Sequence, residues 1–240
     1  MLGQANSKAY VLSLGLLLIV ATFSLSILSN STFNYSKSAL AQPFIQTVKH
    51  RDLVIDLGNG IKTNAQLTIP AVGNGPFPGV LLIPGSGALD MNETLAPNTK
   101  PFWQISQYLS ERGFVVLRYD KRGIGANSQI INASVWGNVT FEDLKHDAKT
   151  ALNVLTQQPE VDKNKITIIG HSEGTLIAPR IAIERGNATN ATTIKNIVLM
   201  GSAATTIADL AYYQKVGIAL EYMHQVLDKN HTGTILSKKL

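Results

Sequence analysis

The chain has 240 residues, of which 45% are hydrophobic and 15% are charged, and it contains no cysteine. This length suits one domain, the small charged fraction favours a packed core over disorder, and the missing cysteines exclude disulfide frameworks, zinc fingers and thiol catalysis. The formal net charge of +5 is not concentrated in a basic cluster, so we expect no nucleic-acid partner.

The amino terminus carries a targeting signal. Ala9–Leu28 is a 20-residue segment without a charged side chain, which is long enough to cross a bilayer as a helix. Downstream, Ala39–Ala41 matches the small-residue cleavage site of a signal peptide. We therefore expect residues 1–41 to be a signal peptide or a membrane anchor with a polar spacer. Both alternatives place residues 42–240 outside the cytoplasm, either secreted or anchored.

A second feature agrees with translocation. The chain contains eight N-x-Ser/Thr sequons, which predict N-glycans, although a composition rich in Asn and Thr produces some sequons by chance. The acceptor asparagines are Asn30, Asn34, Asn92, Asn132, Asn138, Asn187, Asn190 and Asn230.

The remaining chain opens with two extended segments. Gln46–Leu57 and Ile61–Ile69 are joined by Gly58-Asn59-Gly60, a sequence typical of a β-hairpin. Val80–Ile83 is a continuous apolar run, as expected of a strand buried on both faces of a parallel sheet. Pro101 then begins a predicted helix that ends near Arg112.

Strands and helices continue to alternate in the second half. Thr140 and Asp143 form a start like a capping box, which predicts a helix that continues until Pro159. The other predicted elements are strands Phe114–Tyr119, Ile166–Ile169 and Ile194–Met200, a helix ending near Arg185 and a helix over Ile207–Leu227. This order indicates an α/β fold with a mainly parallel, doubly wound sheet, helices on both faces and an antiparallel hairpin at the amino-terminal edge.

The sharpest motif is Gly170-His171-Ser172-Glu173-Gly174, a G-x-S-x-G sequence between a predicted buried strand and a helix. A serine on so tight a turn has a strained backbone, and the residues two positions away on either side must lack a Cβ atom. The helix start offers free N–H groups to a developing oxyanion. The alternative is an ordinary glycine-rich turn.

A second loop supports this interpretation. Pro84-Gly85-Ser86-Gly87 follows the first central strand, where an acyl hydrolase needs a backbone N–H for its oxyanion hole. The stretches Leu82–Glu93, Arg118–Gly125 and Val161–Pro179, taken in this order, resemble the α/β-hydrolase family. The likeness is greater to its serine aminopeptidase-like and prolyl-oligopeptidase-like branches.

The resemblance implies roles for individual residues. Ser172 is expected to be the nucleophile, and the N–H groups of Glu173 and of Ser86 (or Gly87) would form the oxyanion hole. The expected supporting residues are the elbow glycines Gly170 and Gly174 and a structural loop with Asp120, Arg122, Gly123 and Gly125. No cofactor and no metal ion are expected.

The catalytic acid and base are the exception. In this family they follow the serine on loops after two further strands, whereas the chain after its last predicted strand consists mostly of the start of a cap or lid, at about residues 203–240. His224 or His231, with Asp209 and Asp228 nearby, is a candidate base, and a surface histidine is the alternative. We expect the triad Asp and His to be absent, as in an amino-terminal portion of a longer hydrolase or in a degenerate copy.

The resemblance therefore predicts an extracytoplasmic serine hydrolase that cleaves carboxylic ester or amide bonds through an acyl-enzyme on Ser172. Its substrate would be a small-molecule ester, an amide or a peptide, and a membrane could be a further partner through residues 9–28. The alternative is a catalytically inert fragment or a pseudo-hydrolase binding module without the triad Asp and His.

Overall fold

The computed structural model describes residues 47–187, 194–202 and 205–227, all of which belong to one compact unit, Gln46–Leu240. The expected leader at residues 1–41 lies outside the described residues, so the structure does not bear on it. Several further candidates also lie outside them: Asn30, Asn34, Asn190, Asp228, Asn230 and His231. In the part of the chain that is described, no helix is both long and apolar enough to cross a membrane.

The described residues form eight strands and six α-helices, with three further helical turns. The strands are β1 Val48–Gly58, β2 Ile61–Pro70, β3 Phe77–Ile83, β4 Val115–Tyr119, β5 Ile124–Gly125, β6 Gln129–Ile130, β7 Val161–His171 and β8 Ile194–Met200. The helices are α2 Pro101–Ser110, α3 Ala133–Gly137, α4 Phe141–Thr156, α5 Gly174–Gly186, α6 Ile207–Tyr212 and α7 Ile218–Tyr222. The helical turns are η1 Ala126–Ser128, η2 Tyr213–Gly217 and η3 Met223–Leu227.

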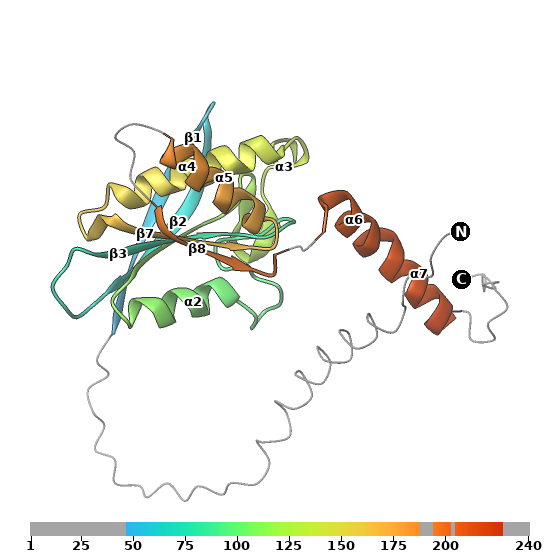
Figure 1. The fold of residues 1–240 in the computed structure, drawn as a ribbon, viewed down its shortest axis with the longest axis horizontal. Helices are drawn as coiled ribbons and strands as arrows, with labels where there is room; N and C mark the ends of the chain where they lie inside the picture. Colours follow the sequence, from blue (N-terminus) through green and yellow to red (C-terminus); the bar gives the residue numbers. More distant parts are fainter. Residues whose placement is uncertain (1–46, 188–193, 203–204, 228–240) are drawn as a thin grey trace, which may run out of the picture. The chain divides into compact units, whose positions relative to one another are not determined.

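The main sheet has six strands in the order β1-β2-β4-β3-β7-β8 (Figure 1). β3 pairs in parallel with β4 and β7, and β7 pairs in parallel with β8. β1 and β2 form an antiparallel hairpin at the edge, and β2 joins β4 in antiparallel orientation. The predicted α/β class, the mainly parallel sheet and the edge hairpin are therefore confirmed.

Helices cover both faces of the sheet, as predicted. Figure 1 shows α4 and α5 on one face and α2 on the other. The strand alternation explains this arrangement, because successive side chains of a strand point to opposite faces. On β3, Leu81 and Ile83 join the larger core under α4 and α5, whereas Val80 and Leu82 pack with Phe102 of α2.

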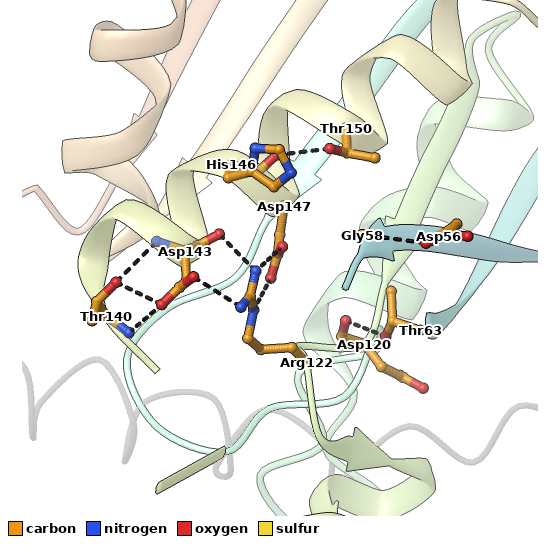
Figure 2. A network of polar contacts seen from close by, with 10 residues as sticks. All are labelled: Asp56, Gly58, Thr63, Asp120, Arg122, Thr140, Asp143, His146, Asp147 and Thr150. Atoms are coloured by element: carbon orange, nitrogen blue, oxygen red, sulfur yellow. Dashed lines mark hydrogen bonds and ion pairs between the residues drawn. The ribbon is translucent and has the colours of Figure 1, made fainter. Parts of the chain in front are cut away.

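The start of α4 has the predicted capping box (Figure 2). The Asp143 N–H donates to Thr140 Oγ1 at 3.2 Å, and the Thr140 N–H donates to Asp143 Oδ2 at 2.9 Å. These two bonds satisfy backbone donors that the first turn of a helix leaves without partners.

Two segments differ from the sequence-based expectation. β7 begins at Val161, five residues earlier than predicted, because Val161 and Asp162 pair with the start of β3 before the register shifts at Gly79. The polar run between Asp162 and Ile166 hides this extension from a hydrophobicity pattern. The loop before α4 contains the small hairpin β5–β6 and α3, which are too short for a periodic signal.

Candidate active site

Ser172 lies on a tight turn between β7 and α5, at the carboxyl end of a central strand. Its backbone has a φ of +49°, which a residue with a side chain adopts only at a cost of roughly 1–3 kcal/mol. The Ser172 N–H donates to the Met200 carbonyl of β8 at 2.9 Å, and the Ser172 carbonyl accepts from the Thr175 N–H at 3.0 Å. The sheet and the helix thus hold the strained residue from both sides.

The two elbow glycines permit this turn. A Cβ atom on Gly170 would collide with the carbonyl group of Gly174, and one on Gly174 would collide with the carbonyl oxygen of Ile83 on β3. Both obstacles are backbone atoms, which cannot rotate away as a side chain can. The spacing of the motif is therefore a packing requirement of this chain.

Ser172 borders a cavity of about 470 Å³, a size typical of small-molecule sites. Ser86 and Glu173 share this border with it. The apolar part of the wall consists of Phe141, Leu176, Leu210 and Ala211. The Arg180 guanidinium carbon lies 5.2 Å from the centre of the Phe141 ring and supplies a cation in the wall.

The expected oxyanion-hole residues lie around Ser172. Glu173 is the N-cap of α5, so its N–H has no acceptor within the helix. Gly85 packs against the Ser172 turn from the other side, since a Cβ atom there would lie 3.2 Å from Ser172 Cβ. Ser86 and Gly87 follow on the exposed part of the loop, where Gly87 has a φ of +95°.

A buried lysine connects the two loops. The Lys121 side chain is 3% exposed, and its Nζ donates to the Gly85 carbonyl at 2.6 Å and to Glu173 Oε2 at 2.8 Å. Burial lowers the pKa of the Lys121 ammonium below its ordinary value, and the negative charge of Glu173 opposes this shift. One cation therefore contacts both the Gly85 loop and the turn that carries Ser172.

A buried glutamate makes a second connection. Glu93 has a φ of +50° and a side chain that is 2% exposed. Its Oε1 accepts from the Gly85 N–H at 2.6 Å, and its Oε2 lies 2.9 Å from His171 Nδ1. The His171 ring also meets the Phe102 ring edge-on, with 6.4 Å between their centres.

Arg122, one of the residues of the expected structural loop, is bound to α4 (Figure 2). Its Nε and Nη2 donate to both carboxylate oxygens of Asp147, at 2.8 and 2.6 Å, and its Nη1 donates to Asp143 at 2.9 Å. Gly123 follows with a φ of +74°, and a Cβ atom there would lie 2.8 Å from the Asn132 carbonyl. Gly125 pairs with Gln129 in the β5–β6 hairpin.

Asp120 is the buried acidic residue of this loop. Its carboxylate accepts from the Met91 N–H at 2.7 Å, and its carbonyl accepts from Thr63 Oγ1 at 2.7 Å (Figure 2). Burial raises the pKa of the Asp120 carboxyl to about 6, and the hydrogen bond from the Met91 N–H counteracts part of this rise.

No histidine in the described part of the chain forms a hydrogen bond with Ser172 Oγ. His50 on β1 lies 3.1 Å from Gln107 of α2, and His171 is paired with Glu93. His224 lies in η3, and Asp209 lies in the first turn of α6, where its Oδ2 accepts from the hydroxyl of the N-cap residue Thr206 at 2.7 Å. Within the same residues, no three His, Asp or Glu side chains converge as metal ligands would.

Sequence reasoning assigned no role to Lys121 or Glu93, although both lie inside the stretches that carry the family resemblance. Lys121 is 52 positions from Glu173, and Glu93 is 78 positions from His171. The sequence shows Lys121 only as a charged residue shortly after a buried strand, and Glu93 only as a charged residue in the loop that follows β3. Their partners become visible only in the fold.

Comparison with known proteins agrees with this geometry. A family model described as serine aminopeptidase, S33, matches residues 98–238. Esterase EstD from Thermotoga maritima is 32% identical over 191 residues, which are 77% of this chain and 41% of the esterase. Esterase FrsA from Yersinia pestis is 28% identical over 155 residues, which are 65% of this chain and 32% of the relative. The chain thus spans less than half the length of the curated relatives it matches.

Solved structures agree on the fold. A hypothetical protein from Pseudomonas aeruginosa aligns with 82% of this chain and 60% of its own, at a TM-score of 0.51 and 17% identity. The α/β hydrolase GrgF from Penicillium aligns with 79% of this chain and 57% of its own, at a TM-score of 0.50 and 17% identity. The tight turn at Ser172, the sheet order and the matched family model together confirm the resemblance, and the chain belongs to the serine aminopeptidase S33 family of the α/β-hydrolase superfamily.

Proposed function

We propose that this protein is a serine esterase in which Ser172 is the nucleophile and the N–H groups of Glu173 and Ser86 bind the oxyanion. The observation that carries the proposal is the backbone of Ser172, which has a left-handed conformation at the border of a cavity. Glycines lie two positions away on either side of it, where neighbouring backbone atoms leave no room for a Cβ atom. Ester bonds are favoured over amides because the curated relatives EstD and FrsA are both named esterases.

The proposed reaction has two steps. Ser172 Oγ attacks the carbonyl carbon of the ester, and its proton passes to a general base. The tetrahedral oxyanion collapses, the C–O bond to the alcohol breaks, and the alcohol leaves with a proton. Water then attacks the acyl-serine in the same way, which releases the carboxylic acid and restores the hydroxyl.

The cavity suggests the substrate class. Its wall next to Ser172 is mostly apolar, with Phe141, Leu176 and Leu210 facing the space. A short or medium aliphatic acyl chain would bury apolar surface there, at about 0.8 kcal/mol for each buried CH₂ group. We therefore propose small esters with an apolar acyl group as substrates.

A fluorophosphonate probe tests the nucleophile. Ser172 Oγ attacks phosphorus, a P–O bond forms, fluoride leaves and the hydroxyl proton goes to solvent, so the protein gains the phosphonyl mass. We expect labelling of the wild-type chain and of the control variant Ser134→Thr, which replaces an exposed serine on α3 and keeps the Asn132 sequon, and no labelling of Ser172→Ala. A folded wild-type protein that stays unlabelled would refute the proposal.

The alternative function is a binding module without catalysis. It is favoured by one observation, the lack of a histidine bonded to Ser172 Oγ in the described residues. A serine without a general base stays protonated and nearly inert at neutral pH. Measurement of p-nitrophenyl butyrate hydrolysis separates the two functions: turnover that disappears in Ser172→Ala supports the esterase, whereas ester binding without turnover supports the binding module.

An extracytoplasmic location is part of the same proposal and rests on the leader and the sequons of the sequence. Among the described acceptor asparagines, Asn132, Asn138 and Asn187 are exposed, whereas the Asn92 side chain accepts from the buried Arg118. We expect glycans at the exposed positions and none at Asn92. Amino-terminal sequencing and mass measurement before and after N-glycan removal test this. A mature start at Gln42 would indicate cleavage, and an unmodified, intact chain in the cytoplasm would contradict the location.

A further inference from the structure

The contacts of Gly85 show how the loop that carries the oxyanion donor is held. The Gly85 N–H is bound by Glu93, and the Gly85 carbonyl is bound by Lys121. Both of these side chains are almost completely buried, and each also binds a neighbour of the nucleophile: Glu93 contacts His171, and Lys121 contacts Glu173. The loop and the turn that carries Ser172 are therefore connected through two buried side chains, one that bonds to each residue next to Ser172.

The contact with Lys121 fixes the orientation of the peptide group between Gly85 and Ser86. The Gly85 carbonyl and the Ser86 N–H belong to the same peptide plane, and in a trans peptide these two groups point in opposite directions. A cation that holds the carbonyl at 2.6 Å therefore also fixes the direction of the Ser86 N–H. Ser86 borders the cavity next to Ser172, so this orientation decides whether a donor or an acceptor faces the reacting carbonyl.

The loop needs such a restraint because its sequence is permissive. Glycines on both sides of Ser86 allow the intervening peptide planes to rotate at little steric cost. A rotated plane would turn the Gly85 carbonyl toward the developing oxyanion, where like partial charges repel. The hydrogen bond from the buried Lys121 ammonium to the Gly85 carbonyl opposes this rotation, because charge-assisted hydrogen bonds are about twice as strong as neutral ones.

We propose that Lys121 is a positioning residue that aligns the loop donor of the oxyanion hole. It orients the Ser86 N–H through the Gly85 carbonyl, and its bond to the Glu173 carboxylate fixes this loop relative to the turn that carries Ser172. Glu93 supports the same loop from its other end through the Gly85 N–H. This assigns the loop donor to Ser86 instead of Gly87, and it rests on the esterase function proposed above.

The variant Lys121→Met tests the proposal, because methionine keeps the apolar stem and removes the ammonium group. We expect the second-order rate of fluorophosphonate labelling to fall by about 10- to 100-fold, somewhat less than the loss on removal of a whole oxyanion donor. The matched control is Lys145→Met, which removes a lysine that is also paired with two carboxylates, Glu142 and Glu184, outside the cavity wall. We expect the control rate to stay within twofold of wild type.

A second readout separates positioning from a general structural role. A trifluoromethyl ketone binds serine hydrolases as a tetrahedral anion, whereas the matching methyl ketone binds as the neutral ground state. Lys121→Met should weaken binding of the trifluoromethyl ketone by tenfold or more and binding of the methyl ketone by less than twofold. Both affinities are measured at a temperature well below the variant's Tm. Equal weakening of both ketones would overturn the positioning role.

Glu173→Gln provides a second variant, because this partly exposed side chain can be replaced with little risk to folding. This variant removes the negative charge that holds the Lys121 ammonium group in place, and we expect fluorophosphonate labelling to be three- to tenfold slower. If Lys121→Met does not fold, Glu173→Gln alone tests the positioning role, and a labelling rate within twofold of wild type would overturn the inference. An unlabelled wild-type protein would instead overturn the proposed esterase, so the two failures are distinguishable.

Discussion

Replacing Arg122 with methionine would leave the buried carboxylate of Asp147 without its partner. The wild-type pair is bidentate, with donor–acceptor distances of 2.8 and 2.6 Å, and the Asp147 side chain is 1% exposed (Figure 2). Removal of one member of a buried ion pair costs about 3–5 kcal/mol, because an uncompensated charge remains in a poorly solvated place. Arg122→Met should therefore lower the free energy of unfolding by this amount at pH 8.

The loss should depend on pH. Burial already raises the pKa of the Asp147 carboxyl above its ordinary value, and the Arg122 guanidinium opposes that rise. Without Arg122 the folded-state pKa rises further, and each additional unit corresponds to about 1.4 kcal/mol. A raised carboxyl pKa contributes stability at low pH that is lost as the pH rises through the folded-state value. The variant's deficit should thus be smaller at pH 5 than at pH 8.

Urea unfolding followed by far-UV circular dichroism at both pH values measures these differences. Lys149→Met is the control, because its pair with Glu184 joins side chains that are 41% and 37% exposed and should contribute less than about 1 kcal/mol. The double variant Arg122→Met/Asp147→Leu should recover most of the lost stability. An Arg122→Met deficit below about 1 kcal/mol at pH 8, or an equal deficit at both pH values, would refute the reasoning.

Two further predictions follow from the same region of the molecule. Burial raises the pKa of the Asp120 carboxyl to about 6, so this residue contributes stability below about pH 4 that is lost as the pH rises through about 6. Asp120→Asn should therefore gain roughly 1–3 kcal/mol relative to wild type between pH 4 and pH 8 in urea unfolding, and a constant difference would contradict this. Gly170→Ala drives a Cβ atom into the Gly174 carbonyl and should cost about 1–3 kcal/mol together with most of the fluorophosphonate labelling. Gly186→Ala, where a Cβ atom meets nothing within 4 Å, should retain both properties, and equal losses in the two variants would exclude the steric explanation.

Much of the fold could be predicted because its signals are local. The β1–β2 hairpin follows from Gly58-Asn59-Gly60, whose three residues all have positive φ angles of 85°, 54° and 76°. The start of α4 follows from Thr140 and Asp143, which are three positions apart and bond to each other. The turn at Ser172 follows from glycines two positions away on either side. Each of these features depends on residues that are neighbours in the chain.

The elements that prediction missed lack such signals. β5, β6 and α3 have two, two and five residues, which is less than one period of any reliable pattern. The early part of β7 carries polar residues because it lies at the rim of the sheet. Arg118 is fully buried inside β4, where Asn92 and Gln66 accept from its guanidinium, and a hydrophobicity pattern could not predict that these partners meet it.

The sequence by itself determined the parallel strands, the tight turn at Ser172 and the family of this protein, because these depend on spacing along the chain. Only the tertiary structure decided how the turn is supported. The order β4-β3-β7 brings the carboxyl ends of three parallel strands to one edge of the sheet. Lys121, Gly85 and Glu173 each follow one of these strands and meet there. Strand order is set by the packing of the whole core, so residues 36 and 52 positions apart could be assigned to one site only after folding.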